Sequence, residues 1–263
     1  TLQVEAGGAD ARPFVTHHNA LDIDLYLRIA TELHLKRMII GGMERVYEIG
    51  RIFRNEGIST RHNPEFTMLE MYCAYGDYNQ LMDFTEEMLR YIAEKLLGTA
   101  ELVYQGKNIS FAKPFRRLRM ADAIKEVTGL DVSTLKTLEE AKAAALKLGV
   151  ELENEDSRGH IINAIFESKV EHTLIEPTFL MDHPVEISPL TKVHRTNEGE
   201  VERFELFVYG RELANGYSEL SDPQDQRERL EEQAKKKAAG NEEAMPLDLD
   251  FIMAMEYGMP PTM

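Results

Sequence analysis

The stretch from residue 45 to residue 75 constrains this chain most, because it has the pattern of two strands joined by a long loop. Both of its ends are rich in β-branched and aromatic residues, whereas its middle is polar and contains glycine, asparagine and proline. Nine residues separate Glu56 from Phe66, which is too many for a tight hairpin turn. Long connections inside compact domains are usually functional or disordered. We therefore expect an antiparallel strand pair that carries a functional loop.

One surface of this strand pair has the side chains of a binding site. Successive side chains on a strand point to opposite faces, so Arg54 and Glu56 share a face. On the second strand the residues that share a face are Phe66, Met68, Glu70 and Tyr72. A guanidinium binds phosphate oxygens bidentately, and a carboxylate beside a phenol suits a cation. These residue types predict a ligand that has both phosphate and ammonium groups.

The opposite surface is apolar and is expected to lie in the core. Its residues are Ile49, Phe53, Leu69 and Met71. The alternative for the charged surface is an ordinary solvated sheet face. Solvated strands favour threonine, lysine and glutamate, so a phenylalanine and a tyrosine interleaved with carboxylates favour a site.

Composition excludes several other classes of protein. The chain has 263 residues, of which 43% are hydrophobic, enough for one large domain or two small ones with a real core. Its formal net charge of -16 disfavours generic nucleic-acid binding, so such a partner would need a local basic patch or another domain. The single cysteine, Cys73, allows no internal disulfide and fits a reducing compartment. Without a signal peptide or a spanning apolar run, we expect a soluble cytoplasmic protein and no membrane partner.

A second chemical region covers residues 203–220, where Gly210 marks a turn between two strands. Glu205 and Glu212 flank this turn and can come opposite each other. Near a phosphate site, two such carboxylates suggest magnesium. The alternative is a pair of exposed acids at strand ends. Asn215 and Glu219 share a face but Glu212 does not, so one pocket for all three requires a bulge, which we expect at Asn215–Gly216.

The remaining patterns predict scaffold around these two regions. We expect an α+β fold with an antiparallel sheet flanked by helices. Helices are expected near residues 31–40, 78–97, 120–128, 138–148, 161–170, 224–239 and 249–257. A hairpin with a turn at 105–108 and a buried strand at 174–180 are expected between them. Lone histidines at 160 and 172 are interpreted as structural.

The first region resembles motif 2 of the class II aminoacyl-tRNA synthetases. The resemblance lies in residues 53–56 (Phe-Arg-Asn-Glu) and 61–70 (Arg-His-Asn-Pro-Glu-Phe-Thr-Met-Leu-Glu). It is closest to the lysyl-tRNA synthetases, and a match of this length is far more specific than a short glycine motif. It implies ATP-dependent activation of L-lysine to lysyl-adenylate, followed by transfer to the 3′ end of tRNA(Lys).

The resemblance also implies a role for each candidate residue. Arg54 is the catalytic residue on the α-phosphate. The implied ATP-binding residues are Arg54, Glu56, His62, Asn63 and Phe66, with Phe66 stacking on adenine. The implied lysine-binding residues are Gly8, Glu32, Glu70, Tyr72, Asn215 and Glu219. Glu205 and Glu212 are implied to hold Mg²⁺. Without the family, Gly8 is equally well a flexible turn, and Glu32 a residue favoured by the helix dipole.

The domain organisation that the resemblance implies is a catalytic core over residues 1–263, trimmed at both ends. Most of motif 1, which forms much of the homodimer interface, would precede Thr1, and motif 3 would follow Met263. An N-terminal anticodon-binding domain is expected to be absent, and residues 100–173 to be a helical and hairpin insertion. We expect this chain alone to bind ATP poorly. Two alternatives remain: a paralogous ligase that modifies an elongation factor, and a non-catalytic fragment.

Overall fold

The chain divides into two compact units in a computed structural model that describes residues 1–60, 62–152 and 155–263. The first unit contains residues 1–76 and 219–263, and the second contains residues 77–218. Arg61, which belongs to the motif of the first region, lies outside the described residues. Both units mix helices with antiparallel strands, so the expected α+β class is confirmed.

The first unit holds the 45–75 stretch. Its elements are β1 (Leu2–Gln3), β2 (Val15–His18), β3 (Ile23–Leu27), α1 (Glu32–Ile40), β4 (Arg45–Phe53), β5 (Glu65–Cys73), α6 (Pro223–Ala238) and α7 (Leu249–Glu256). Strands β1, β3 and β2 form one small sheet, and β4 and β5 pair antiparallel as predicted. The helix expected near residues 31–40 is α1, whose C-cap is Gly41.

The register of β4 and β5 places the predicted residues on one face. Ile52 pairs with Phe66, and Glu48 pairs with Glu70. Glu48 is joined by an ion pair to Arg28, whose Nε donates to the Arg51 carbonyl at 2.8 Å. The face that holds Phe66 and Glu70 is thus the better covered face of the strand pair.

The opposite face of β4 and β5 is exposed at Ile49 and Leu69 and half-buried at Phe53 and Met71. This corrects the expectation that the whole face lies in the core. Ile49 is 63% exposed and Leu69 is 41% exposed, and Tyr47 beside them is 73% exposed. Alternation along a strand tells which residues share a face, but it does not tell whether anything covers that face.

The second unit is built on a four-stranded sheet, whose strands are β8 (Arg116–Arg119), β9 (Thr178–Met181), β10 (Arg203–Val208) and β11 (Arg211–Tyr217). A separate hairpin consists of β6 (Glu101–Tyr104) and β7 (Lys107–Ser110). Its helices are α2 (Tyr78–Leu97), α3 (Met120–Thr128), α4 (Leu138–Lys147) and α5 (Arg158–Lys169), with 3₁₀ turns at Val132–Thr134, Glu171–Thr173 and Val185–Ile187. The sheet order is β11-β10-β9-β8 and all pairs are antiparallel except β8–β9.

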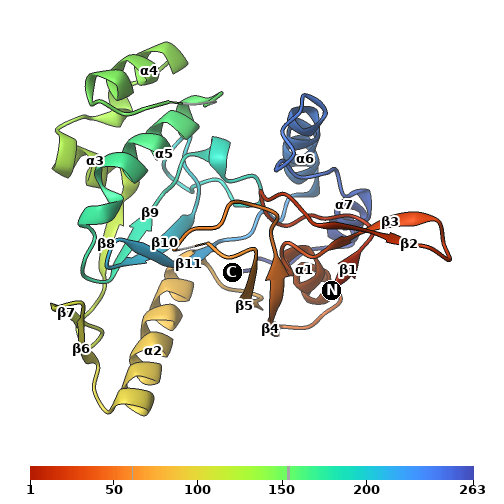
Figure 1. Cartoon of the computed structure of the whole chain (residues 1–263), viewed down its shortest axis with the longest axis horizontal. Coiled ribbons are helices and arrows are strands. Elements are labelled where there is room, and N and C mark those ends of the chain that lie inside the picture. Colours follow the sequence, from red (N-terminus) through yellow and green to blue (C-terminus); the bar gives the residue numbers. More distant parts are fainter. Residues whose placement is uncertain (61, 153–154) are drawn as a thin grey trace. The chain divides into compact units, whose positions relative to one another are not determined.

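Helices cover both faces of this sheet. In Figure 1, α2 lies on one side of it, and α3 and α5 lie on the other with α4 beyond them. Leu180 and Phe207 point toward α3 and α5 and join their apolar core. On the side of α2, a Cβ atom at Gly216 would lie 2.7 Å from Leu81 and 2.8 Å from Phe204, so this glycine permits close packing. The insertion predicted for residues 100–173 falls within this unit and stays a prediction.

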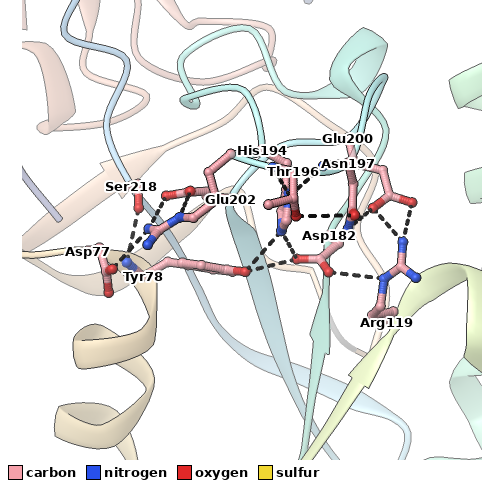
Figure 2. A network of polar contacts seen from close by, with 11 residues as sticks. Asp77, Tyr78, Arg119, Asp182, His194, Thr196, Asn197, Glu200, Glu202 and Ser218 are labelled. Atoms are coloured by element: carbon pink, nitrogen blue, oxygen red, sulfur yellow. Dashed lines mark hydrogen bonds and ion pairs between the residues drawn. The ribbon is translucent and has the colours of Figure 1, made fainter.

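A network of charged and polar side chains joins the start of α2 to the loops after β9 and before β10 (Figure 2). Tyr78 donates to Asp182 Oδ1 at 3.1 Å, and Arg119 donates to Asp182 Oδ2 at 3.2 Å. Glu202, which is 1% exposed, accepts from Arg195 at 2.5 and 3.0 Å. Because each of these acids has a cationic or hydroxyl partner, the network is explained by fold stability alone.

Most other expected elements are present, with small differences. The 105–108 turn is a two-residue connection in which Gln105 and Gly106 both have positive φ. The strand expected at 174–180 is confined to Thr178–Met181. His160 Nδ1 is hydrogen-bonded to Ser157 Oγ at 2.6 Å, and Ser157 is the N-cap of α5. This contact fits the structural interpretation of His160. Among the described residues, no helix is both long and apolar enough to cross a membrane.

Candidate functional site

Four charged side chains of the first unit form what we call the acidic cluster: Glu32, Lys36, Glu70 and Glu219. Glu32 and Lys36 are one turn apart on α1, so both point to the same side of the helix. Lys36 Nζ lies 2.6 Å from Glu32 Oε1 and forms an ion pair with Glu219 Oε2. Glu70, on β5, accepts from the Thr31 backbone N–H at 3.0 Å. The structure thus brings together three of the residues predicted to bind lysine.

The acidic cluster has more carboxylates than cations. Burial raises the pKa of Glu70, and the neighbouring charge of Glu32 raises it further. Burial also raises the pKa of Glu219 to about 8; Glu32 and Glu70 add to this rise, and Lys36 opposes it. For Lys36, burial lowers the pKa, but the carboxylates of Glu219 and Glu32 more than reverse this effect, so its pKa is raised. A further cation would therefore stabilise the cluster.

Two further predicted residues border this cluster. The Tyr72 hydroxyl donates to Glu70 Oε2 at 3.2 Å, which orients that carboxylate. Gly8 has a φ of 90°, and a Cβ atom there would lie 3.2 Å from the Cβ atoms of Ala30 and Glu32. Both its conformation and its surroundings therefore favour glycine at this position.

Arg54 and Phe66 lie beside each other on the predicted site face. The Arg54 Cζ atom is 5.4 Å from the centre of the Phe66 ring, and both residues are half-buried. Arg54 Nε donates to the Ile29 carbonyl at 3.3 Å, and its backbone N–H donates to the Pro64 carbonyl at 2.9 Å. The guanidinium is held by one long hydrogen bond and by the ring. This arrangement suits binding of an anionic group beside a flat aromatic surface.

The other residues predicted to bind ATP lie on the exposed loop. Glu56, His62 and Asn63 are all exposed. His62 is bonded to Ser59 through its ring and its backbone, each at 3.0 Å. Asn63 donates to the Glu65 carbonyl at 2.7 Å. In the described part of the loop these polar groups thus order the backbone, and their roles toward ATP stay predictions.

In the second unit, Glu205 has two basic side chains beside it. Its Oε1 accepts from Arg203 Nη2 at 2.6 Å, and its Oε2 lies 3.5 Å from Nε2 of the fully buried His183. Burial alone would raise the pKa of Glu205, but Arg203 and His183 lower it to about 2. Arg203 also donates to the Asn215 side chain at 2.9 Å, so one guanidinium joins two predicted site residues.

A β-bulge brings Glu212 to the face of Glu205, although not at the predicted position. Asn215 pairs with Glu205 and Ala214 with Leu206, but Glu212 pairs with Phe207, so Leu213 is the extra residue. The need for a bulge is confirmed, and its expected place at Asn215–Gly216 is wrong, because Gly216 serves the close contact with α2.

Glu205 and Glu212 fit a magnesium ion in their donor type. They present carboxylate oxygens on one face of neighbouring strands, and Mg²⁺ takes one or two carboxylates together with phosphate oxygens and water. Among the described residues, no group of three or more histidine, cysteine or acidic side chains is placed to hold a metal. Two carboxylates without a third ligand thus make any metal site here dependent on its substrate.

Sequence reasoning missed three residues that organise these groups: Lys36, Arg203 and His183. Each is a cationic or titratable side chain that bonds to a predicted acid. The spacing of Glu32 and Lys36 at i and i+4, and of Arg203 and Glu205 on one strand face, is a signal that could have found two of them. Nothing in the sequence around His183 marks it.

Comparison with known proteins places the chain in a family. Residues 1–263 match the family described as tRNA synthetases class II (D, K and N), and the chain belongs to it. Over 262 residues the chain is 60% identical to the lysine–tRNA ligase of Nostoc punctiforme (strain ATCC 29133 / PCC 73102), covering 99% of this chain and 47% of that protein. It is 59% identical over 261 residues to the lysine–tRNA ligase of Enterococcus faecalis (strain ATCC 700802 / V583), covering 99% and 52%. The chain thus spans about half the length of these curated relatives.

Proposed function

We propose that this chain carries the amino-acid activation site of a lysine–tRNA ligase. In the proposed reaction a carboxylate oxygen of L-lysine attacks the α-phosphorus of ATP, and the bond to pyrophosphate breaks. The products are lysyl-adenylate and pyrophosphate. The lysyl group is then transferred to the 3′ end of tRNA(Lys), and AMP leaves. No side chain acts as a nucleophile, so catalysis consists of positioning and charge neutralisation.

The observation that carries this proposal is the acidic cluster. It places two carboxylates on one buried lysine and a third, Glu70, within electrostatic reach of both, and this excess of negative charge favours a ligand with ammonium groups. L-Lysine has two such groups. Identity of about 60% to lysine–tRNA ligases supports the same substrate.

The remaining groups are proposed to have the roles that the family resemblance implies. Arg54 neutralises the α-phosphate with its bidentate guanidinium, beside an adenine that stacks on Phe66. Glu56, His62 and Asn63 contact ATP from the loop. Gly8, Tyr72 and Asn215 join Glu32, Glu70 and Glu219 in binding the amino acid. Glu70 and Glu219 are assigned to the ε-ammonium group and Glu32 to the α-ammonium group.

Magnesium enters this proposal through Glu205 and Glu212, which would hold it. When bound, the ion neutralises charge on the phosphates as pyrophosphate leaves. Arg203 keeps Glu205 ionised and oriented at neutral pH, since it holds one carboxylate oxygen.

We also propose that the whole protein is a cytoplasmic homodimer that recognises tRNA(Lys) with surfaces beyond the acidic cluster. The exposed face of β4 and β5, with Tyr47, Ile49 and Leu69, supports a protein–protein contact because three large apolar side chains lie together on it. Dimerisation is tested by sedimentation of the whole protein with and without the substitution Ile49→Glu. Only the variant is expected to dissociate into monomers.

The test of the amino-acid site is calorimetric titration of the chain with L-lysine and with L-norleucine, which has the same carbon chain but no ε-ammonium group. Lysine is expected to bind at least tenfold more tightly, because only lysine adds a second cation to the acidic cluster. Equal affinities, or no binding of either, would overturn the proposal.

The role of Arg54 in binding ATP is tested with Arg54→Lys in the whole protein. A point charge does not reproduce the bidentate fork, so lysine-dependent pyrophosphate exchange is expected to fall sharply while circular dichroism is unchanged. Exchange at the normal rate would return Arg54 to a structural role. Assay of tRNA(Lys) and of an elongation factor as acceptors then separates the synthetase from its paralogue.

A further inference from the structure

Lys36 is the only lysine among the described residues that is fully buried, and it lies at the centre of the acidic cluster. Its ammonium group contacts Glu32 on its own helix and Glu219 from the last segment of the first unit. A buried ammonium persists only when anionic partners offset its loss of water. Two carboxylates do so here, and neither the motif resemblance nor the proposed roles assign Lys36 any part.

The groups that face Lys36 determine the charge of the cluster. Glu32 on α1 and Glu219 contact Lys36 itself. Glu70 on β5 acts on both of these carboxylates, and the Tyr72 hydroxyl donates to Glu70. The pKa of Glu219, raised to about 8, means that its carboxylate ionises fully only at higher pH or beside an added cation. In that state, with the three carboxylates ionised and Lys36 protonated, the cluster carries a net charge of about -2 by simple Coulomb counting. One L-lysine molecule brings two ammonium groups. The charge that Lys36 leaves uncompensated therefore equals the charge that these two groups supply.

We infer that Lys36 is a positioning residue for amino-acid binding: it fixes the Glu32 and Glu219 carboxylates and leaves just enough negative charge for one L-lysine molecule to neutralise. This inference rests on the proposed function. Lys36 itself does not touch the amino acid. Without Lys36 nothing in the cluster offsets the repulsion among the three carboxylates, so Glu219 keeps its proton to a higher pH than in the intact chain and its carboxylate is no longer held in place for the ligand.

The alternative is that Lys36 only stabilises the fold. Both roles predict that Lys36→Met lowers stability, so stability does not separate them. A change in the pH dependence of lysine binding does, because a residue that acts only on the fold leaves the proton release that accompanies lysine binding unchanged. Lys36 lowers the pKa of Glu219 in the intact chain, so its removal raises that pKa further.

The experiment measures the affinity of the chain for L-lysine by calorimetry between pH 6.5 and pH 9, for the unchanged chain and for Lys36→Met. In the variant we expect an affinity at least tenfold weaker at pH 7. The affinity of the variant should recover toward pH 9 as the carboxylates ionise. The midpoint of this pH dependence should lie about one pH unit above that of the unchanged chain, which corresponds to about a tenfold change in the ionisation equilibrium. Lys36→Arg keeps the charge and should restore the original midpoint.

Arg37→Met is the matched control. Arg37 is the next residue of α1 and pairs with Asp248 at 2.7 and 2.8 Å, away from the acidic cluster. Its loss should lower stability without moving the midpoint. If the midpoint of the pH dependence of lysine affinity is unchanged in Lys36→Met while the unchanged chain binds lysine normally, the inference is overturned and the proposed function is not.

A second readout needs no variant. Titration of the glutamate side-chain carboxyl carbons by nuclear magnetic resonance in the unchanged chain is expected to show raised midpoints for Glu70 and Glu219, which fall when L-lysine is added. Ordinary midpoints near 4.5 for both carboxyls would overturn the inference even if Lys36→Met does not fold. Raised midpoints with no lysine binding would instead overturn the proposed function, and the amino-acid role of Lys36 with it.

Discussion

Glu219 in the first unit and Glu205 in the second are both largely buried glutamates with a basic partner, yet their pKa values move in opposite directions. Burial raises that of Glu219 to about 8, whereas Arg203 and His183 overcome burial and lower that of Glu205 to about 2. Glu219 shares one ammonium group with Glu32, while Glu205 has a guanidinium and an imidazole beside it. The number of basic side chains per carboxylate, more than burial itself, therefore decides whether the pKa of a buried glutamate is raised or lowered.

Arg203→Met is expected to have the largest effect, since it removes the compensation of Glu205. The guanidinium donates to Glu205, Asn215, Ser188 and the Ile187 carbonyl, and the variant leaves a buried carboxylate without its main partner. Breaking a buried pair costs about 3 to 5 kcal/mol of unfolding free energy. Urea unfolding followed by circular dichroism measures it. Arg116→Met, which breaks an exposed pair with Glu126, should cost less than about 1 kcal/mol; equal losses would contradict the comparison.

The pH dependence of stability should also have opposite signs at the two glutamates. A raised folded-state pKa means that folded Glu219 binds a proton which the unfolded chain has released, so its contribution is present below pH 4.5 and is lost as pH rises through about 8. Glu205, whose pKa is lowered to about 2, contributes above pH 4.5 and loses this contribution as pH falls toward 2.

Unfolding of the unchanged chain and of Glu219→Gln at pH 5 and pH 8 tests the first of these signs. The difference between the two proteins should change by roughly 2 to 4 kcal/mol over this interval, in favour of the unchanged chain at pH 5. Glu205→Gln is the control, because Glu205 is ionised at both values and its effect should stay constant. A constant difference for Glu219→Gln would place its pKa in the normal range.

Glu219→Gln should also weaken lysine binding at least tenfold, about 1.4 kcal/mol, because the amide does not offset an ammonium charge. The affinity for ATP should barely move. Calorimetry with each ligand separates the two, and equal losses for both would remove Glu219 from the side-chain end of the amino acid.

The smallest effect is expected for Gly8→Ala, at about 1 to 2 kcal/mol of unfolding free energy. A non-glycine residue at a φ of 90° is strained, and its Cβ atom would press on Ala30 and Glu32. Lysine affinity should fall with it because Glu32 is displaced. Gly57→Ala is the control, since a Cβ atom there meets nothing within 4 Å. An unchanged affinity would mean that Glu32 does not depend on this contact.

The sequence was informative where local patterns decide the structure. Helix and strand positions, the pairing of β4 with β5 and the face shared by Phe66, Glu70 and Tyr72 all follow from periodicity. It was uninformative where distant residues decide. The exposure of Ile49 depends on whether anything covers that face, and the burial of Lys36 depends on Glu219, which lies 183 positions further along the chain.

The candidate site shows the same division. The predicted acids Glu32, Glu70 and Glu219 were found because a motif resemblance named them, and the structure places them together. Their cationic neighbours Lys36 and Arg203 were not found, because a lysine or arginine beside acids in sequence is ordinary on a protein surface. Only the fold shows that Lys36 is fully buried and that Arg203 is half-buried.

The bulge at Leu213 has a consequence for how β11 tolerates change. Its extra residue moves Glu212 to the face of Glu205, and its own side chain is 55% exposed. Two residues between Glu212 and Asn215 would put these side chains on opposite faces of a regular strand, and the bulge restores the shared face. Deleting Leu213 would leave Ala214 alone between them, so plain alternation would keep Glu212 on the face of Glu205 without any bulge. This strand is therefore expected to tolerate the loss of Leu213 better than the loss of Ala214, its paired neighbour.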